Sequence, residues 1–367
     1  MKLPLPLAYA ARPAAALYAL AVGGRNLYYD LWPRAATRAP IPVVCVGNLT
    51  TGGTGKTPMT AWLADFFCNQ GLRPAILSRG YGRKNPKASL LLPPGPRPAA
   101  IRPEECGDEA LVLKELQPDI PLLLDGDRVR GAKNALRHFQ PDLLLLDDGF
   151  QHRRLEHDFN LIMVDGRRMF GNRKLLPAGP LRESFAALER AHTVIINKAD
   201  QLHPDFAEQA AELLPRIPTR RIFFAAYHIS GFRTPNNNLK LSPTDLGQRP
   251  LTAVAGLGNN DYFFTQLENL GLELQAKIAF NDHHNYTRAD LKRLKRQADD
   301  GLLLTTTKDY VKLAQLAIRT GEKGFLDRLL TTEIELEIRE QERFLELFQP
   351  LMRELYPQPK LGLLARK

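Results

Sequence analysis

The chain is poor in cysteine, and its three cysteines lie far apart in the sequence. Cys45, Cys68 and Cys106 form no CxxC pair, whereas structural zinc sites are usually built from closely spaced cysteine and histidine residues. The spacing also excludes the dense disulfide framework of small secreted proteins and fits a reducing compartment. The sequence therefore offers neither redox chemistry nor a structural zinc site.

The chain also lacks an apolar run long enough to cross a membrane. Near its start the apolar stretch 14–23 is shorter than the roughly 20 residues that a spanning helix requires. No cleavage site of a secretory signal follows this stretch. Pro4, Pro6 and Pro13 are expected to prevent a helix before residue 14.

Beyond residue 14, leucines recur at helical spacing with aromatic residues among them. These residues are Leu17, Leu20, Leu27, Leu31, Tyr18, Tyr28, Tyr29 and Trp32. One interpretation is a helix packed on the protein's own core. The other is a helix lying in the bilayer surface, where tyrosine and tryptophan are favoured. We expect residues 1–40 to form an N-terminal membrane-associated helical segment.

Acidic residues are fewer than basic ones. The 50 Lys and Arg residues against 40 Asp and Glu residues give a formal net charge of +10. This excess indicates an anionic partner, which could be nucleic acid, an acidic membrane surface or a phosphorylated substrate. Part of the positive charge lies in the apolar, aromatic N-terminal segment, which suits a membrane better than a nucleic acid. We therefore expect no nucleic-acid partner.

Short apolar strands alternate with helices along most of the chain. Strands are expected at residues 41–46, 75–77, 122–124, 143–146, 160–164, 193–196, 252–255, 275–280, 302–305 and 332–338. Helices are expected at residues 58–69, 109–116, 128–139, 262–270, 288–297 and near 344–355, whereas the proline-rich residues 84–104 are expected to be a surface excursion. This alternation predicts an α/β protein with a doubly wound sheet.

Proline, asparagine, serine and glycine cluster between residues 225 and 250 and indicate a domain boundary. We expect a first α/β domain over residues 41–228 and a second, smaller α/β domain over residues 229–338. Residues 339–367 are expected to form a C-terminal helix and tail.

The strongest motif is the glycine-rich turn GGTGKT at residues 52–57, between a strand and a helix. Such a turn allows backbone N–H groups to point at phosphate oxygens, with a helix N-terminus behind them. Lys56 is expected to reach the β- and γ-phosphates, and the Thr57 hydroxyl to hold Mg²⁺. The expected nucleotide-binding residues are Thr50, Thr51, Gly52, Gly53, Thr54, Gly55, Lys56 and Thr57. The first domain is therefore predicted to be of the P-loop NTPase type.

Acidic residues follow a second apolar strand, in the pattern LLLLDD at residues 143–148. A parallel strand delivers its terminal carboxylate to the sheet edge where Mg²⁺ lies in P-loop proteins, so Asp147 and Asp148 are candidate metal ligands. A surface turn is the other interpretation. Asp108 opens a helix, where the helix dipole favours an acid without any catalytic role.

Residues 197–200, with the sequence NKAD, look like the base-reading motif of GTPases. Thr50 stands where the strict P-loop pattern has glycine, as in a variant loop of metallochaperones and some kinases. A GTP-hydrolysing metallochaperone is therefore the main alternative, although it should offer Cys or His metal ligands in a CxxC pair or a His-rich tract. A basic nucleic-acid-binding ATPase is a third possibility.

Taken together, these motifs resemble the tetraacyldisaccharide 4′-kinase family, the lipid A kinases of Gram-negative bacteria. The matching stretches lie in order at residues 46–58, 78–83, 107–109, 147–152, 175–183, 282–284 and 306–309. They cover most of the chain and are far more specific than the P-loop alone.

The resemblance implies an enzyme that uses ATP and Mg²⁺. It would transfer the γ-phosphate to the 4′-hydroxyl of a tetraacyldisaccharide 1-phosphate and yield lipid IVA. It also implies two α/β domains joined by a short ribbon, and an N-terminal helix on the cytoplasmic face of the bacterial inner membrane. We expect the enzyme to be a monomer.

The resemblance also implies roles for individual residues. Asp108 and His283 look like the acid–base pair, with the adjacent His284 as the alternative to His283. Arg128 and Arg182 look like phosphate-contacting residues that act together with Lys56. Thr57, Asp147, Asp148 and Glu183 look like the Mg²⁺ shell, and residues 197–200 like the adenine side of the pocket.

Overall fold

The structure, a computed structural model, describes residues 5–96, 101, 103–202, 206, 215, 217–234 and 239–355. The strands are β1 Val43–Gly47, β2 Pro74–Ser78, β3 Leu90–Leu92, β4 Leu122–Leu124, β5 Leu143–Asp147, β6 Phe159–Asp165, β7 Thr193–Asn197, β8 Ile222–Arg233, β9 Lys240–Leu241, β10 Leu251–Ala255, β11 Leu274–Ala279, β12 Leu302–Thr305 and β13 Leu329–Ile338. The α-helices are α1 Leu5–Leu31, α2 Lys56–Asn69, α3 Pro103–Cys106, α4 Asp108–Leu116, α5 Arg128–Phe139, α7 Asn260–Asn269, α8 Arg288–Ala298, α9 Thr307–Arg319, α10 Gln341–Glu346 and α11 Gln349–Leu355.

The described strands form one 13-stranded sheet in the order β11-β10-β12-β13-β8-β7-β6-β1-β5-β2-β4-β3, with β9 paired to β8. Strands β2, β4, β5, β1, β6, β7 and β8 are parallel neighbours, and β10, β11, β12 and β13 form a second parallel group. Helices cover the sheet, as the alternation of elements predicted. The doubly wound α/β fold is thus confirmed.

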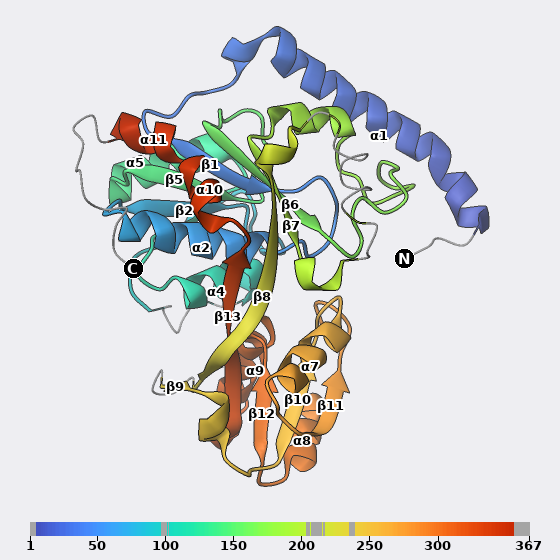
Figure 1. The fold of residues 1–367 in the computed structure, drawn as a ribbon, viewed down its shortest axis with the longest axis vertical. Coiled ribbons are helices and arrows are strands. Elements are labelled where there is room, and N and C mark those ends of the chain that lie inside the picture. Colours follow the sequence, from blue (N-terminus) through green and yellow to red (C-terminus); the bar gives the residue numbers. More distant parts are fainter. Residues whose placement is uncertain are drawn as a thin grey trace.

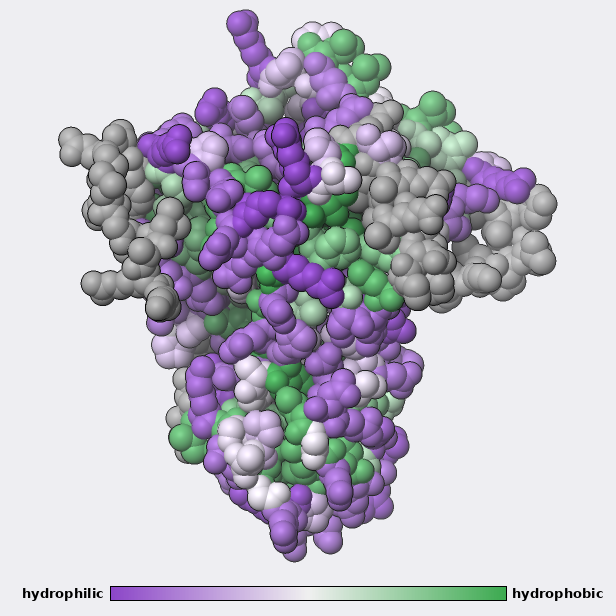
Figure 2. Space-filling view, viewed as in Figure 1, coloured by the Kyte–Doolittle hydropathy of each residue, from purple (hydrophilic) through white to green (hydrophobic). Residues whose placement is uncertain are grey.

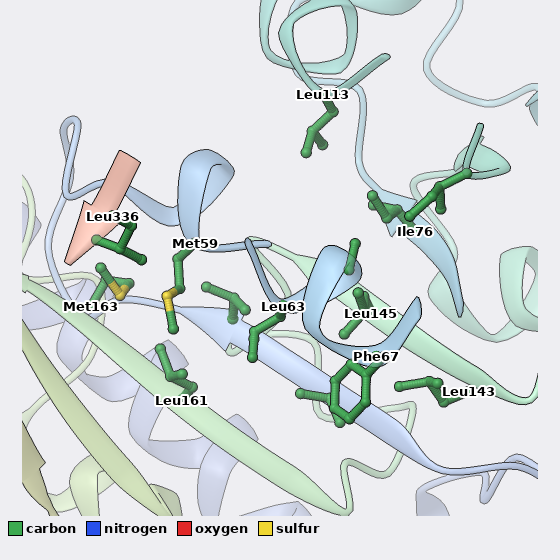
Figure 3. Close-up of a cluster of buried hydrophobic side chains, with 14 of the residues drawn as sticks. Met59, Leu63, Phe67, Ile76, Leu113, Leu143, Leu145, Leu161, Met163 and Leu336 are labelled. Carbon is green, nitrogen blue, oxygen red and sulfur yellow. The ribbon is translucent and has the colours of Figure 1, made fainter. Parts of the chain in front are cut away.

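Alternate residues of β1 face opposite sides of the sheet, and each side has its own core. Val44 and Val46 pack in a cluster with α2, α4 and the two C-terminal helices, whereas Val43 and Cys45 pack in a cluster with α5. Figure 3 shows the side chains of α2 in the first cluster against those of the strands. Burial on both faces explains why the central strands are almost continuously apolar.

Strand order brings the P-loop and the acidic strand end to one edge. β1 pairs in parallel with β5, and the register sets Val46 beside Asp147. β2 lies on the other side of β5, with Ser78 beside the same aspartate. The loop after β1 and the carboxylate at the end of β5 are therefore neighbours, as parallel pairing requires.

Two long strands run between the two halves of the molecule (Figure 1). The first half contains β1 to β7, and the second half contains β10 to β12. β8 and β13 pair in antiparallel fashion from Ala225 opposite Ile338 to Arg233 opposite Thr331. β8 passes through residue 228, where we expected the first domain to end. The division into domains at that residue stays a prediction.

Helix α1 starts earlier than expected. We expected the prolines to prevent a helix before residue 14, and this was wrong, because α1 begins at Leu5 and contains Pro13. Residue 6 falls in the first turn, where backbone N–H groups have no intrahelical partner, and an interior proline removes only one of the helix's hydrogen bonds. Within the part of the chain that the structure describes, no helix is long and apolar enough to cross a membrane.

The C-terminal segment forms two short helices where we expected one. Pro350 lies in the first turn of α11 and cannot donate the hydrogen bond that would continue α10. Phe348, between the two helices, is completely buried and its ring lies 4.5 Å from that of Phe159 in β6. The segment thus closes the core of the first half of the chain.

Candidate functional site

The P-loop occupies the turn between β1 and α2. Gly52 and Gly55 have φ angles of +107° and +89°, which side-chain-bearing residues rarely adopt. A Cβ on Gly55 would also lie 2.6 Å from the Tyr227 hydroxyl oxygen, whereas a Cβ on Gly53 would meet nothing within 4 Å. The loop is therefore packed on its rear side and open on its front, which leaves room for phosphate.

Side chains from other strands brace the loop from behind. Asn197, at the end of β7, donates from Nδ2 to the carbonyl of Thr54 at 3.2 Å. The hydroxyl of Tyr227 in β8 donates to the carbonyl of Gly55 at 2.9 Å. Because two carbonyls of the loop are held in this way, the loop's backbone conformation is fixed in advance of any ligand.

The NKAD stretch is therefore partly structural. Lys198 forms an ion pair with Asp165 at the end of β6. The carboxylate of Asp200 accepts a hydrogen bond from the hydroxyl of Tyr262 in α7 at 3.2 Å. These contacts tie the P-loop edge to the second half of the chain, and the adenine-side role of this stretch stays a prediction.

Lys56, at the first position of α2, faces the acidic strand end. Its Nζ lies 3.7 Å from Oδ1 of Asp148, and Nη1 of Arg182 lies 2.8 and 2.9 Å from the two oxygens of the same carboxylate. Burial acts to raise the pKa of Asp148, but Lys56 and Arg182 outweigh it and hold that pKa below its usual value. Asp148 is thus ionised at neutral pH.

Asp147 has a different environment although it is the next residue. It is almost completely buried and accepts a hydrogen bond from the Thr60 hydroxyl at 3.3 Å. Burial, together with the negative charges of Glu109 and Asp148, raises the pKa of Asp147 to about 7. Too little positive charge lies near this carboxylate to stabilise its ionised form, and a bound divalent cation would supply that charge.

Arg128 begins α5, where the side chain of Asp127 caps the helix. Only 2% of Arg128 is exposed, and burial lowers its pKa to about 10 even though Asp148 and Asp147 act to raise it. Its Nε is buried without a hydrogen-bond partner among the described residues. A buried guanidinium with a spare donor beside the P-loop fits a phosphate group.

The site has the parts that a magnesium–nucleotide complex needs. In phosphotransferases Mg²⁺ is usually bound by one or two carboxylates together with phosphate oxygens. Asp147 and Asp148 supply the carboxylates, and Thr57 lies in the first turn of α2 beside Lys56. The donor set therefore fits Mg²⁺.

Glu183 has partners of another kind. Its carboxylate is fully buried and accepts hydrogen bonds from the side chains of Arg25, of Asn26 at 3.3 Å and of Arg190 at 2.6 Å. Two of these partners belong to α1. The metal role implied by resemblance stays a prediction, and the observed contacts offer it no support.

Asp108, at the start of α4, meets residues of the second half of the chain. Oδ2 of Asp108 lies 3.7 Å from Nδ1 of His283 and 2.5 Å from Nζ of Lys312. His284 instead lies 3.2 Å from Asp290 through its Nε2. Of the two adjacent histidines, His283 is thus the one that faces Asp108.

Lys312 was missed by the sequence analysis. Its Nζ also lies 3.3 Å from the carbonyl oxygen of His284, so it joins α4 to the loop before α8. A signal was available, since Lys312 lies four residues after Lys308 and therefore on the same face of α9. Lys308 itself pairs with Asp282 at 2.6 Å, immediately before His283.

The fold and this site define a P-loop nucleotide-binding protein whose second half supplies groups beside the nucleotide site. The family model described as tetraacyldisaccharide-1-P 4′-kinase matches residues 7–353 of the chain. The chain belongs to this family.

Individual relatives agree with this assignment. A tetraacyldisaccharide 4′-kinase of Syntrophus aciditrophicus is 35% identical over 92% of this chain and 91% of its own length. One of Syntrophobacter fumaroxidans is 37% identical over 84% of this chain and 80% of its own length. The crystal structure of LpxK from Aquifex aeolicus in complex with ATP superposes with a TM-score of 0.74 at 28% identity, over 94% of this chain and 99% of that one.

The raised pKa of Asp147 predicts a pH-dependent stability of the metal-free protein. Its pKa is 3.8 in the unfolded chain and about 7 in the folded protein, so the folded state keeps a proton that the unfolded chain releases. The contribution of Asp147 to stability is therefore greatest below about pH 4 and falls as the pH rises through about 7. We expect Asp147→Asn to remove this fall and to be more stable than wild type at about pH 8.

Urea unfolding in the presence of a chelator at about pH 5 and about pH 8 measures the effect. If Asp147→Asn keeps the full loss of stability between the two pH values, Asp147 is not the group that titrates.

Proposed function

We propose that the chain is an ATP-dependent kinase that phosphorylates the 4′-hydroxyl of a tetraacyldisaccharide 1-phosphate, giving lipid IVA in lipid A biosynthesis. The observation that carries this proposal is that the half of the chain that holds the P-loop and the carboxylates Asp147 and Asp148 also holds Asp108, which contacts His283 and Lys312 of the second half. Family membership supports the acceptor, and the Aquifex aeolicus relative was solved with ATP. The family does not favour a GTP-hydrolysing metallochaperone.

On the nucleotide side, the backbone amides of residues 52–57 bind the phosphates, and Lys56 and Arg128 offset their charge. Thr57, Asp147 and Asp148 hold Mg²⁺, which neutralises phosphate charge when it is bound. Phosphoryl transfer needs positioning and charge neutralisation more than covalent catalysis. The arrangement supplies both from rigid elements, a helix N-terminus and two strand ends.

On the acceptor side, we assign Asp108 as the base. It takes the proton of the 4′-hydroxyl, whose oxygen then forms a bond to the γ-phosphorus while the bond to the bridging oxygen of ADP breaks. His283 orients the carboxylate from 3.7 Å, and Lys312 pairs with the same carboxylate oxygen, Oδ2, at 2.5 Å. Because both partners come from the second half of the chain, the base is complete only when the two halves are together.

A groove beside α1 suits a lipid that carries both acyl chains and phosphate. The groove has a volume of about 540 Å³. Its lining combines apolar Leu175, Ala178, Leu181 and Phe185 with basic Arg12, Arg173 and Lys174. Apolar surface can receive acyl chains, and the basic side chains can meet a phosphate group.

The outer face of α1 supports attachment to the membrane surface. Leu17 and Leu20 are 70% and 73% exposed, Leu27 and Leu31 continue the same apolar face, and Trp32, just after the helix, is also exposed. Figure 2 shows hydrophobic patches along the line of α1. Exposed leucines at helical spacing match a helix lying in a bilayer surface, and we propose the cytoplasmic face of the inner membrane and a monomeric enzyme.

The first test of this function is a kinase assay. With labelled ATP, Mg²⁺ and a tetraacylated disaccharide 1-phosphate in detergent micelles, we expect a doubly phosphorylated lipid. Lys56→Ala should lower kcat on the order of 100-fold or more, because no other group replaces its charge at the phosphates. Lys87→Ala, at an exposed lysine, is the matched control. Transfer from GTP in preference to ATP would overturn the assignment.

The acid–base pair predicts non-additive losses. Asp108→Ala and His283→Ala should each lower kcat on the order of 100-fold or more with little change in KM for ATP. The double variant should be scarcely slower than the slower single variant, because the two residues act as a unit. His228→Ala, at another half-exposed histidine paired with an acid, should be silent. Multiplying losses would show that Asp108 and His283 act independently.

Membrane attachment is tested on the apolar face of α1. The double change Leu17→Glu, Leu20→Glu should weaken binding to anionic vesicles on the order of 100-fold, because each leucine loses its burial in the bilayer. Ile318→Glu changes an isoleucine of α9 that is 55% exposed and serves as the control. Unchanged sedimentation of the Leu17/Leu20 variant with vesicles would place the attachment elsewhere.

A further inference from the structure

Glu183 is a buried charge that the chemistry of phosphate transfer does not explain. Its side chain is 0% exposed and is enclosed by the guanidinium groups of Arg25 and Arg190. A buried carboxylate is tolerated only when it is paired, and an apolar pair of the same size is often at least as stable. The ionic contact is therefore better suited to fixing an orientation than to adding stability.

Arg182, the residue before Glu183, contacts both Asp148 and the P-loop. The guanidinium of Arg182 binds both oxygens of Asp148. Its backbone N–H donates to the carbonyl of Leu49 in the P-loop at 2.7 Å. Its carbonyl accepts a hydrogen bond from the hydroxyl of Tyr18 in α1 at 2.9 Å. Two consecutive residues thus connect α1 to both the P-loop and the acidic strand end.

A second connection joins α1 to Arg153. Arg153 follows the segment that begins with Asp147 and Asp148. Its guanidinium lies 2.7 Å from the carbonyl oxygen of Asn26 and 2.7 Å from a carboxylate oxygen of Asp30, both in α1. It also lies 5.5 Å from the centre of the Tyr29 ring. The inner face of α1 therefore contacts both of the segments that determine where Asp148 lies.

We propose that Glu183 is a positioning residue: through its contact with Arg25 and Asn26, α1 holds Arg182 on Asp148, so that the seating of α1 sets the affinity of the site for magnesium–nucleotide. This inference rests on the nucleotide site of the proposed function. It assigns α1 a role inside the protein besides the apolar face that it turns outward. It also replaces the direct metal role of Glu183 with an indirect one.

The experiment measures binding of Mg²⁺ with a non-hydrolysable ATP analogue to the full chain in detergent, without lipid. We expect Arg25→Ala and Glu183→Gln each to weaken binding about tenfold. In the Arg182→Ala background either change should have little further effect, because the path runs through Arg182. Arg25→Lys should restore much of the affinity. Arg34→Ala, an exposed arginine just after α1, is the matched control.

Three results would overturn the inference. One is unchanged nucleotide affinity in folded Arg25→Ala protein, and another is a loss that multiplies fully with that of Arg182→Ala. The third is a Glu183→Gln variant that alone shifts the Mg²⁺ dependence while Arg25→Ala is silent, which marks Glu183 as a metal ligand. Should Glu183→Gln fail to fold, Asn26→Ala and Tyr18→Phe each remove one contact and must show the same dependence on Arg182. If wild type fails to bind the analogue, the proposed function fails instead.

Discussion

Two aspartates, one buried and one partly buried, lie side by side at the end of one strand, and the rest of the site depends on the positive charges that they require. Like charges in a place of low dielectric repel strongly and lose their hydration. Lys56 and Arg182 stabilise the ionised form of Asp148, and Asp147 is left with a raised pKa. The second carboxylate therefore lacks a neutralising charge, and this supports the magnesium site proposed above.

The neutralising groups come from separate elements, and this links distant parts of the chain. Lys56 starts α2, Arg128 starts α5, and Arg182 lies in the segment on which α1 rests. The pair Asp108 and Lys312 joins α4 to α9 across the two halves. Under the proposals above, a change in the seating of α1 acts on Arg182 and Asp148, and a change in the approach of the second half acts on Asp108. Under the proposed function, this arrangement would connect the membrane, the nucleotide and the acceptor.

The sequence correctly predicted features that depend on a single strand, helix or turn. The apolar strands and the glycine turn predicted the P-loop and the strand end at Asp147, and both were found where expected. The expectations that failed depended on context. Helix α1 continues through Pro13, and the C-terminal segment is interrupted at Pro350, although the same residue type stands at both places. Whether a helix tolerates a proline depends on what packs against the flanking turns.

By itself the sequence determined the doubly wound class, the phosphate loop and the acids at the strand end, because the alternation of strands and helices and the turns between them follow from short local patterns. Only the tertiary structure decided which histidine faces Asp108, that Lys312 joins it, and that Glu183 binds α1. These partners lie 158 to 204 residues apart in the sequence. Contacts at such separations leave no periodic signal in the chain, since they depend on how whole elements pack.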